Sequence, residues 1–223
     1  MIPIEFFLII FGIICLTHII AIAFQKNKLR YITKIFIVPV LLASYLAGKG
    51  NHNIFTVLAL IFGWIGDILL IKKKKRNIFK LGIISFLAGH LCYILVFLYC
   101  LGFFSGSGGV INSIALLVYI PVMIFGGICI FRLIKPFKEM KPIVIIYMII
   151  IESMSLWGLQ VFVLHPGFAG VSIFLGSFLF LISDTMLSYY SFRKIKVPGA
   201  VMIMVTYILA QTGIVMGILH LPV

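Results

Sequence analysis

Long apolar runs separated by short polar breaks fill the chain from one end to the other. A helix that crosses the hydrocarbon of a bilayer needs about 20 mostly apolar residues. By that measure the pattern predicts eight membrane-spanning helices, over Glu5–Phe24, Lys34–Ala47, Ile54–Ile71, Leu81–Leu101, Asn112–Ile134, Ile143–Leu164, Ala169–Ser191 and Ala200–Leu221. The second is the shortest, and its start is placed at Lys34 or as early as Tyr31. The runs and breaks use the whole sequence, so we predict a single all-α transmembrane domain over residues 1–223.

Composition narrows the class of protein. Of the 223 residues, 63% are hydrophobic and 10% are charged, and only five are acidic. A soluble domain is about one quarter charged, so this chain is too poor in charge to cover a water-facing surface. The four cysteines lie inside apolar runs without Cys-x-x-Cys spacing, which is typical of small buried side chains. The sequence therefore excludes a soluble domain, a disordered chain and a secreted disulfide scaffold.

The net charge of +13 indicates how the chain is oriented in the membrane, because of where the basic residues lie. Seventeen of the 18 Lys and Arg residues fall in the first, third, fifth and seventh breaks, and only Lys49 lies elsewhere. Positive residues collect in cytoplasmic loops. We therefore predict odd-numbered breaks in the cytoplasm and both termini outside. The Ile- and Lys-rich composition favours a multi-pass protein of a bacterial plasma membrane, whose expected partners are membrane lipids. The same distribution argues against binding to nucleic acid.

Ionisable side chains inside the predicted helices are the main functional candidates, because each is costly in hydrocarbon unless it is paired or hydrated. At about 1.5 Å per residue, all of them lie in the half of the bilayer next to the basic breaks. We expect them to meet in one polar cavity that opens inward. They are Asp67, Asp184, Glu152, His90 and His18, with Gln160 and Gln211 as uncharged companions.

Structural interpretations stand beside the functional ones. Asp67 and Asp184 can also serve only to hold helices together, by pairing with basic residues at the inner ends. His18 is best interpreted as a hydrogen-bonded packing residue. For His90 a functional role and a structural role are equally favoured. Glu152 favours the site, because Ser153, Ser155 and Trp157 lie near it in sequence.

No cofactor and no metal ion are predicted. The sequence lacks His-x-x-x-His spacing, Cys/His clusters, a glycine-rich phosphate loop and a Gly-x-Ser-x-Gly elbow. A metal site assembled across helices from His18, His90 and Asp184 stays open at this point.

Two aspartate motifs carry a family resemblance. Phe62-Gly63-Trp64-Ile65-Gly66-Asp67-Ile68-Leu69-Leu70 and Gly176-Ser177-Phe178-Leu179-Phe180-Leu181-Ile182-Ser183-Asp184-Thr185 resemble segments of the YhhN family of lysoplasmalogenase-like membrane proteins. Gly82, with Phe86 to Tyr93 around His90, is similar to the family's next helix. Tyr207 with Gln211, and Lys34 followed by Pro39, resemble further elements of the family.

The resemblance implies an activity. Members of that family hydrolyse the vinyl ether bond of lysoplasmalogens to a fatty aldehyde and a glycerophospho-headgroup product. By resemblance, Asp67 and Asp184 are the catalytic carboxylates, and Lys34, His90, Tyr93, Tyr207 and Gln211 support them; Glu152 joins this set on its depth alone. The expected partner is a lysophospholipid or another ether lipid.

Other classes of function remain open from the sequence. They are a hydrolase of a different lysolipid or ether lipid, a small proton-coupled transporter that uses the same acids as a proton relay, and a membrane scaffold without activity.

Overall fold

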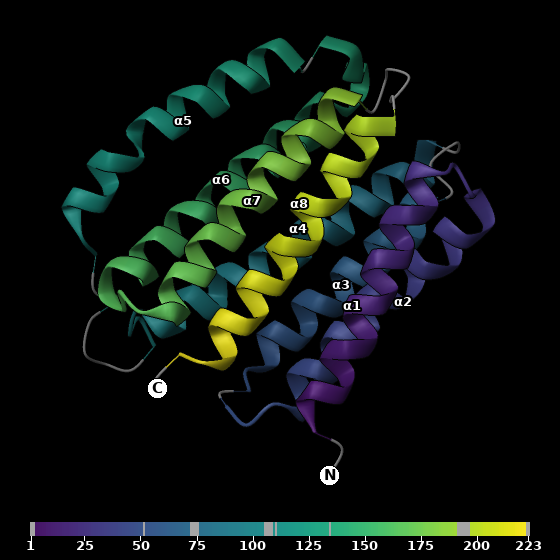
Figure 1. The fold of residues 1–223 in the computed structure, drawn as a ribbon. Helices are drawn as coiled ribbons and strands as arrows, with labels where there is room; N and C mark the ends of the chain where they lie inside the picture. Colours follow the sequence, from purple (N-terminus) through teal and green to yellow (C-terminus); the bar gives the residue numbers. More distant parts are fainter. Residues whose placement is uncertain are drawn as a thin grey trace.

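Eight α-helices make up nearly all of the computed structural model, which describes residues 3–50, 52–71, 76–104, 109, 111–133, 135–190 and 197–221 (Figure 1). Each helix is long and apolar enough to cross a membrane. This confirms the predicted all-α class, the predicted number of helices and a multi-pass membrane protein. The helices are α1 (Ile4–Ala23), α2 (Asn27–Ala47), α3 (Ile54–Ile71), α4 (Arg76–Cys100), α5 (Ser113–Leu133), α6 (Lys141–Leu164), α7 (Phe168–Tyr190) and α8 (Val197–Leu219).

Several helices begin earlier than predicted. Helix α2 begins at Asn27 rather than at Lys34, and α4 begins at Arg76 rather than at Leu81. The hydropathy pattern marks only the hydrocarbon, whereas a helix continues into the interface, where long basic side chains reach water. A short 3-10 helix, η1 (Lys135–Met140), also lies in the fifth break. The predicted ends at Ile134 and Ser191, and the basic residues Lys72–Lys75, Arg193, Lys194 and Lys196, lie outside the described residues.

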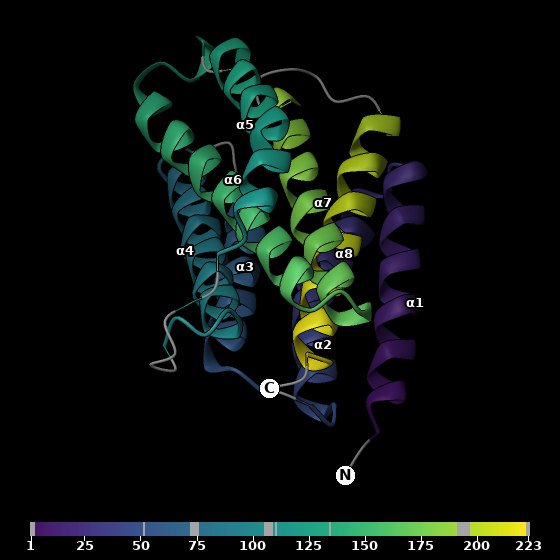
Figure 2. The same cartoon turned by 90° about the vertical axis from the view of Figure 1, so that its left-hand side faces the viewer.

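The helices run alternately up and down. Helix α1 begins and α8 ends at the same end of the bundle (Figures 1 and 2). The opposite end, where α1 ends and α2, α4 and α6 begin, is called the basic end here. The basic residues near this end whose side chains are described are Lys26, Lys28, Arg30, Lys34, Lys80, Arg132 and Lys141.

Close helix pairs form the centre of the bundle. Helices α3 and α4 pack together, as do α7 and α8, and α6 contacts both α7 and α4. Glycine permits the α7–α8 approach, since a Cβ at Gly176 would lie 2.7 Å from the backbone nitrogen of Ile214. Helix α5 stands at one edge and diverges from the others, opposite α1 (Figure 1). The centre of the bundle, where α3, α4, α6, α7 and α8 meet, is therefore where polar groups can be sheltered from lipid.

An indole hydrogen bond joins α2 to α3. Pro39 lies inside α2 and has no N–H, so the carbonyl of Ile35, four residues earlier, lacks its usual helical donor. The indole Nε1 of Trp64 donates to that carbonyl at 2.8 Å. Trp64 thus satisfies a backbone group that the proline leaves open, in a medium that offers little water.

We expect Trp64→Phe to lower the free energy of unfolding by about 1–3 kcal/mol, because it leaves the Ile35 carbonyl unsatisfied. In a Pro39→Ala background the new N–H of residue 39 supplies the missing bond, so the same substitution should cost much less. Reversible unfolding in detergent micelles measures this double-mutant cycle, with Trp157→Phe as the matched control. Equal costs of Trp64→Phe in the two backgrounds would contradict this account of the hydrogen bond.

Candidate active site

Asp67 of α3 is the first of two buried carboxyls, with 2% of the residue exposed. Its Oδ1 lies 3.0 Å from Nζ of Lys34 on α2, and its Oδ2 accepts a hydrogen bond of 2.7 Å from the hydroxyl of Tyr207 on α8. Lys34 lies within the second turn of α2, so the early start of that helix brings its ammonium to the level of Asp67. Three helices therefore meet at one charge-compensated carboxylate.

Asp184 of α7 is the second buried carboxyl, with 5% of the residue exposed. The hydroxyl of Tyr147 on α6 donates a short hydrogen bond to its Oδ2. Nε2 of His90 on α4 lies 4.0 Å from the same oxygen. Among the described residues, no lysine or arginine forms an ion pair with Asp184, so its surroundings differ from those of Asp67.

His90 is enclosed by aromatic rings. Its imidazole meets the ring of Phe180 edge-on at 4.7 Å between centroids, and the ring of Tyr147 at 5.4 Å. Only 1% of the residue is exposed, and within the described part of the chain neither ring nitrogen has a hydrogen-bond partner. A buried imidazole with both nitrogens unpaired is costly unless water or a ligand meets it.

Phe180 connects the two carboxyls. Its ring packs on His90, beside Asp184, and at 5.5 Å on Tyr207, beside Asp67. Phe180 therefore lies between the surroundings of the two aspartates. We call Lys34, Asp67, His90, Tyr147, Asp184 and Tyr207 the carboxylate cluster.

Gln211 and Tyr93 extend this cluster. Gln211 lies one turn after Tyr207 on α8, and its Oε1 accepts a hydrogen bond of 2.7 Å from the hydroxyl of Tyr93 on α4. A Cβ at Gly63 on α3 would lie 3.3 Å from the Gln211 amide nitrogen, so glycine leaves room for that side chain. The predicted supporting residues Tyr93, Tyr207 and Gln211 therefore lie side by side.

Two predicted candidates face other neighbours. The carboxyl of Glu152 on α6 packs against Gly126 of α5, and the hydroxyl of Tyr119 on α5 hydrogen-bonds the Glu152 backbone carbonyl at 3.3 Å. His18 on α1 is fully buried, and its Nδ1 hydrogen-bonds Oγ1 of Thr33 at 2.7 Å. The structure does not bring Glu152 to the carboxylate cluster, and the His18 contact agrees with a packing role.

Tyr147 is the functional candidate that the sequence did not indicate. It lies near the start of the sixth predicted span, where aromatic residues ordinarily form the interfacial belt. Its hydroxyl instead points inward to Asp184. Within the described residues, no group of three or more His, Cys, Asp or Glu side chains is arranged to hold a metal ion.

These features define a class of protein. It is a multi-pass helical membrane protein in which two buried aspartates lie near a histidine that is enclosed by aromatic rings. The YhhN family profile matches residues 29–218, which include every residue of the carboxylate cluster. The chain belongs to the YhhN family, which includes lysoplasmalogenase hydrolases. Comparisons with curated proteins and with solved structures gave no significant match.

Proposed function

We propose that this protein hydrolyses the vinyl ether bond of a 1-alkenyl lysophospholipid, as a lysoplasmalogenase does. The observation that carries the proposal is the pair of buried aspartates in one cluster, of which Asp67 alone forms an ion pair with a lysine among the described residues. Membership of the YhhN family supports the same reaction. A scaffold that needs only helix–helix ion pairs would not require a second buried acid that has no lysine or arginine ion pair among the described residues.

The reaction suits an acid and a carboxylate. A proton adds to the vinyl carbon that is β to the ether oxygen, which leaves an oxocarbenium ion. Water adds to that cation and loses a proton, giving a hemiacetal that collapses to a fatty aldehyde and the headgroup alcohol. Glycoside hydrolysis passes through a related cation with two carboxyl groups in comparable roles.

Asp184 is the general acid in this proposal. Among the described residues Asp184 forms no ion pair with a lysine or arginine, and a carboxyl in such buried surroundings can supply the proton that the vinyl group needs. Tyr147 donates to Oδ2, so Oδ1 is left to hold the transferable proton. After the transfer, the Asp184 carboxylate accepts a proton from the attacking water, which restores the acid.

Asp67 is the carboxylate that stabilises the oxocarbenium ion. Lys34 pairs with it and Tyr207 donates a hydrogen bond to it, so that its position is fixed before the cation forms. Neither ring nitrogen of His90 has a hydrogen-bond partner among the described residues, so the imidazole is suited to orient the water. The Lys34 ammonium has further donors for the substrate phosphate.

The charge distribution supports an orientation. We infer that the basic end faces the cytoplasm and that both termini lie outside, because Lys and Arg gather on the inner side of a plasma membrane. The carboxylate cluster would then be reached from the inner leaflet.

The test uses the purified protein in detergent with three lysophospholipids that differ only at the first chain, as alkenyl ether, alkyl ether or acyl ester. We expect aldehyde release from the alkenyl ether alone, because only its double bond can be protonated. In D₂O the aldehyde should carry one deuterium on the carbon next to the carbonyl. In membrane vesicles, hydrolysis should require substrate on the cytoplasmic face.

Cleavage of the acyl ester with no aldehyde from the alkenyl ether would contradict the proposal and indicate a different lysolipid hydrolase. Aldehyde without deuterium would contradict protonation at carbon. Hydrolysis only from the outer face would overturn the orientation.

A further inference from the structure

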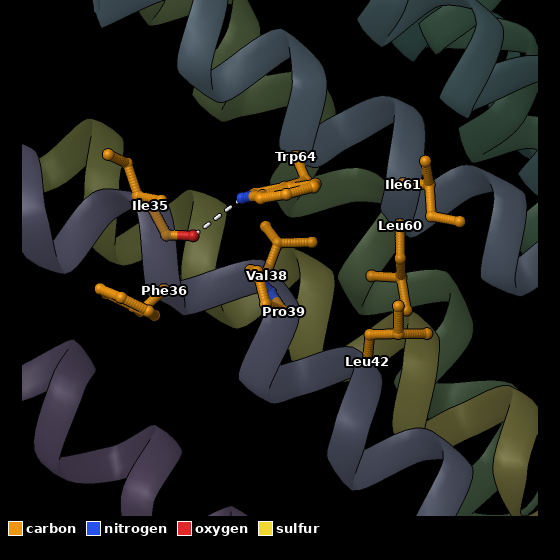
Figure 3. Close-up of a pocket in the computed structure, with 8 residues that line it drawn as sticks. All are labelled: Ile35, Phe36, Val38, Pro39, Leu42, Leu60, Ile61 and Trp64. Atoms are coloured by element: carbon orange, nitrogen blue, oxygen red, sulfur yellow. Dashed lines mark hydrogen bonds between the residues drawn. The ribbon is translucent and has the colours of Figure 1, made fainter.

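An apolar groove lies on the bundle between α2 and α3, with a volume of about 260 Å³ (Figure 3). Phe36, Pro39 and Leu42 of α2 line it, together with Leu60, Ile61 and Trp64 of α3. The ring of Phe36 is about half exposed, so the groove is open towards the lipid side of the bundle. The groove can therefore accept an apolar ligand that enters sideways from the lipid.

One end of the groove lies about one helical turn from the Lys34–Asp67 pair of the carboxylate cluster. At its end nearest the basic end, the indole of Trp64 is hydrogen-bonded to Ile35, and the two residues tie the helices together (Figure 3). Lys34 directly precedes Ile35, and Asp67 lies about one turn beyond Trp64. Their 3.0 Å ion pair joins the same two helices at the next level.

The Lys34–Asp67 ion pair places a positively charged group near this end of the groove. The side chain of Lys34 is 18% exposed, against 3% for that of Asp67, so the cation is the member that an approaching ligand meets first. A lysophospholipid has one hydrocarbon chain and one phosphate, joined through the bond to be cleaved. An apolar slot followed by an ammonium matches that order.

We propose that the α2–α3 groove binds the hydrocarbon chain of the single-chain lipid substrate and that Leu42 and Ile61 set the chain length accepted. This inference rests on the proposed function for the identity of the ligand. Beyond the proposed function, it gives a lateral route by which a lipid in the membrane would reach the carboxylate cluster. Trp64 would then lie beside the first carbons of the lipid chain.

Binding can be measured apart from hydrolysis, because Trp64 is one of only two tryptophans in the chain. The protein carries Trp157→Phe, so that Trp64 is the sole emitter, and the probe is acyl lysophosphatidylcholine brominated along its chain. We expect saturable quenching of Trp64 that unlabelled lysophospholipid reverses. The pair Leu42→Phe and Ile61→Phe fills the groove and should weaken this quenching about tenfold, while Ile13→Phe on the lipid-facing side of α1 should not.

Hydrolysis provides a second readout. With long-chain alkenyl substrate the filled groove should raise KM about tenfold, while kcat for a short-chain substrate stays at the wild-type value. Unchanged quenching and unchanged KM in the filled variant would overturn the inference. Equal quenching by a brominated diacyl lipid would also overturn it, because the groove would then hold bulk lipid. Saturable, groove-dependent quenching in a protein that releases no aldehyde would support the groove and contradict only the proposed reaction.

Discussion

Replacing Asp184 by Asn should lower kcat for the alkenyl lysophospholipid by about 10²- to 10⁴-fold, the range that a positioned general acid contributes. Asn keeps the shape of the side chain and can still accept the hydrogen bond of Tyr147, but it has no proton to give to carbon. Aldehyde release by the purified variant measures the effect.

A loss of activity is informative only if the Asp184→Asn protein is folded. If Asp184 is neutral in the folded protein, exchange for a neutral amide of the same size should change the unfolding free energy little. Glu5→Gln is the matched control, because it makes the same chemical change at an exposed carboxylate in the first turn of α1. A folded Asp184→Asn protein with wild-type activity would contradict the role of Asp184 as acid.

The helices could be predicted from the sequence because a bilayer imposes strict rules on a chain. Every backbone group in hydrocarbon must be paired within the helix, so length and hydropathy alone fix the count. The helix starts were harder, as α2 shows, because Lys28 and Arg30 belong to the helix but lower its hydropathy. Hydropathy measures where the lipid ends, whereas the hydrogen-bond ladder measures where the helix ends.

The residues of the site were easier to predict than their partners. Asp67 and Asp184 are found by the cost of burying a carboxyl, and their motifs add the resemblance. Which tyrosine serves which aspartate depends on helix contacts across 140 residues for Tyr207 and 37 for Tyr147, and no local pattern encodes those contacts.

Glu152 shows that depth in the membrane does not by itself identify a residue of the site. It lies on α6 at a depth that suggested the site, yet it is five residues beyond Tyr147, which does reach Asp184. Five residues at about 100° each turn the side chain roughly 140° around the helix axis, so two residues at that spacing cannot face the same neighbour. Tyr147 faces α7, and Glu152 faces α5.

Lys34→Met should destabilise the protein by about 3–5 kcal/mol, the usual consequence of removing one partner from a buried ion pair. Methionine keeps the length and much of the packing of the lysine stem, but Asp67, with 3% of its side chain exposed, would lose the ammonium at 3.0 Å and keep the hydrogen bond from Tyr207. Unfolding in detergent micelles gives the free energy. Lys28→Met, at an exposed position of the same helix, is the matched control and should stay within about 0.5 kcal/mol of the wild type.

The double variant Lys34→Met with Asp67→Asn separates stability from activity. It removes both charges together, so most of the lost stability should return, because no uncompensated carboxylate remains in the bundle. Activity should not return, since the cation formed at the vinyl ether then lacks the negative charge that stabilises it. Full stability in Lys34→Met alone would contradict the contribution of this ion pair to the fold. A double variant that is both stable and active would remove Asp67 from the mechanism and leave Asp184 as the only acid that the reaction needs.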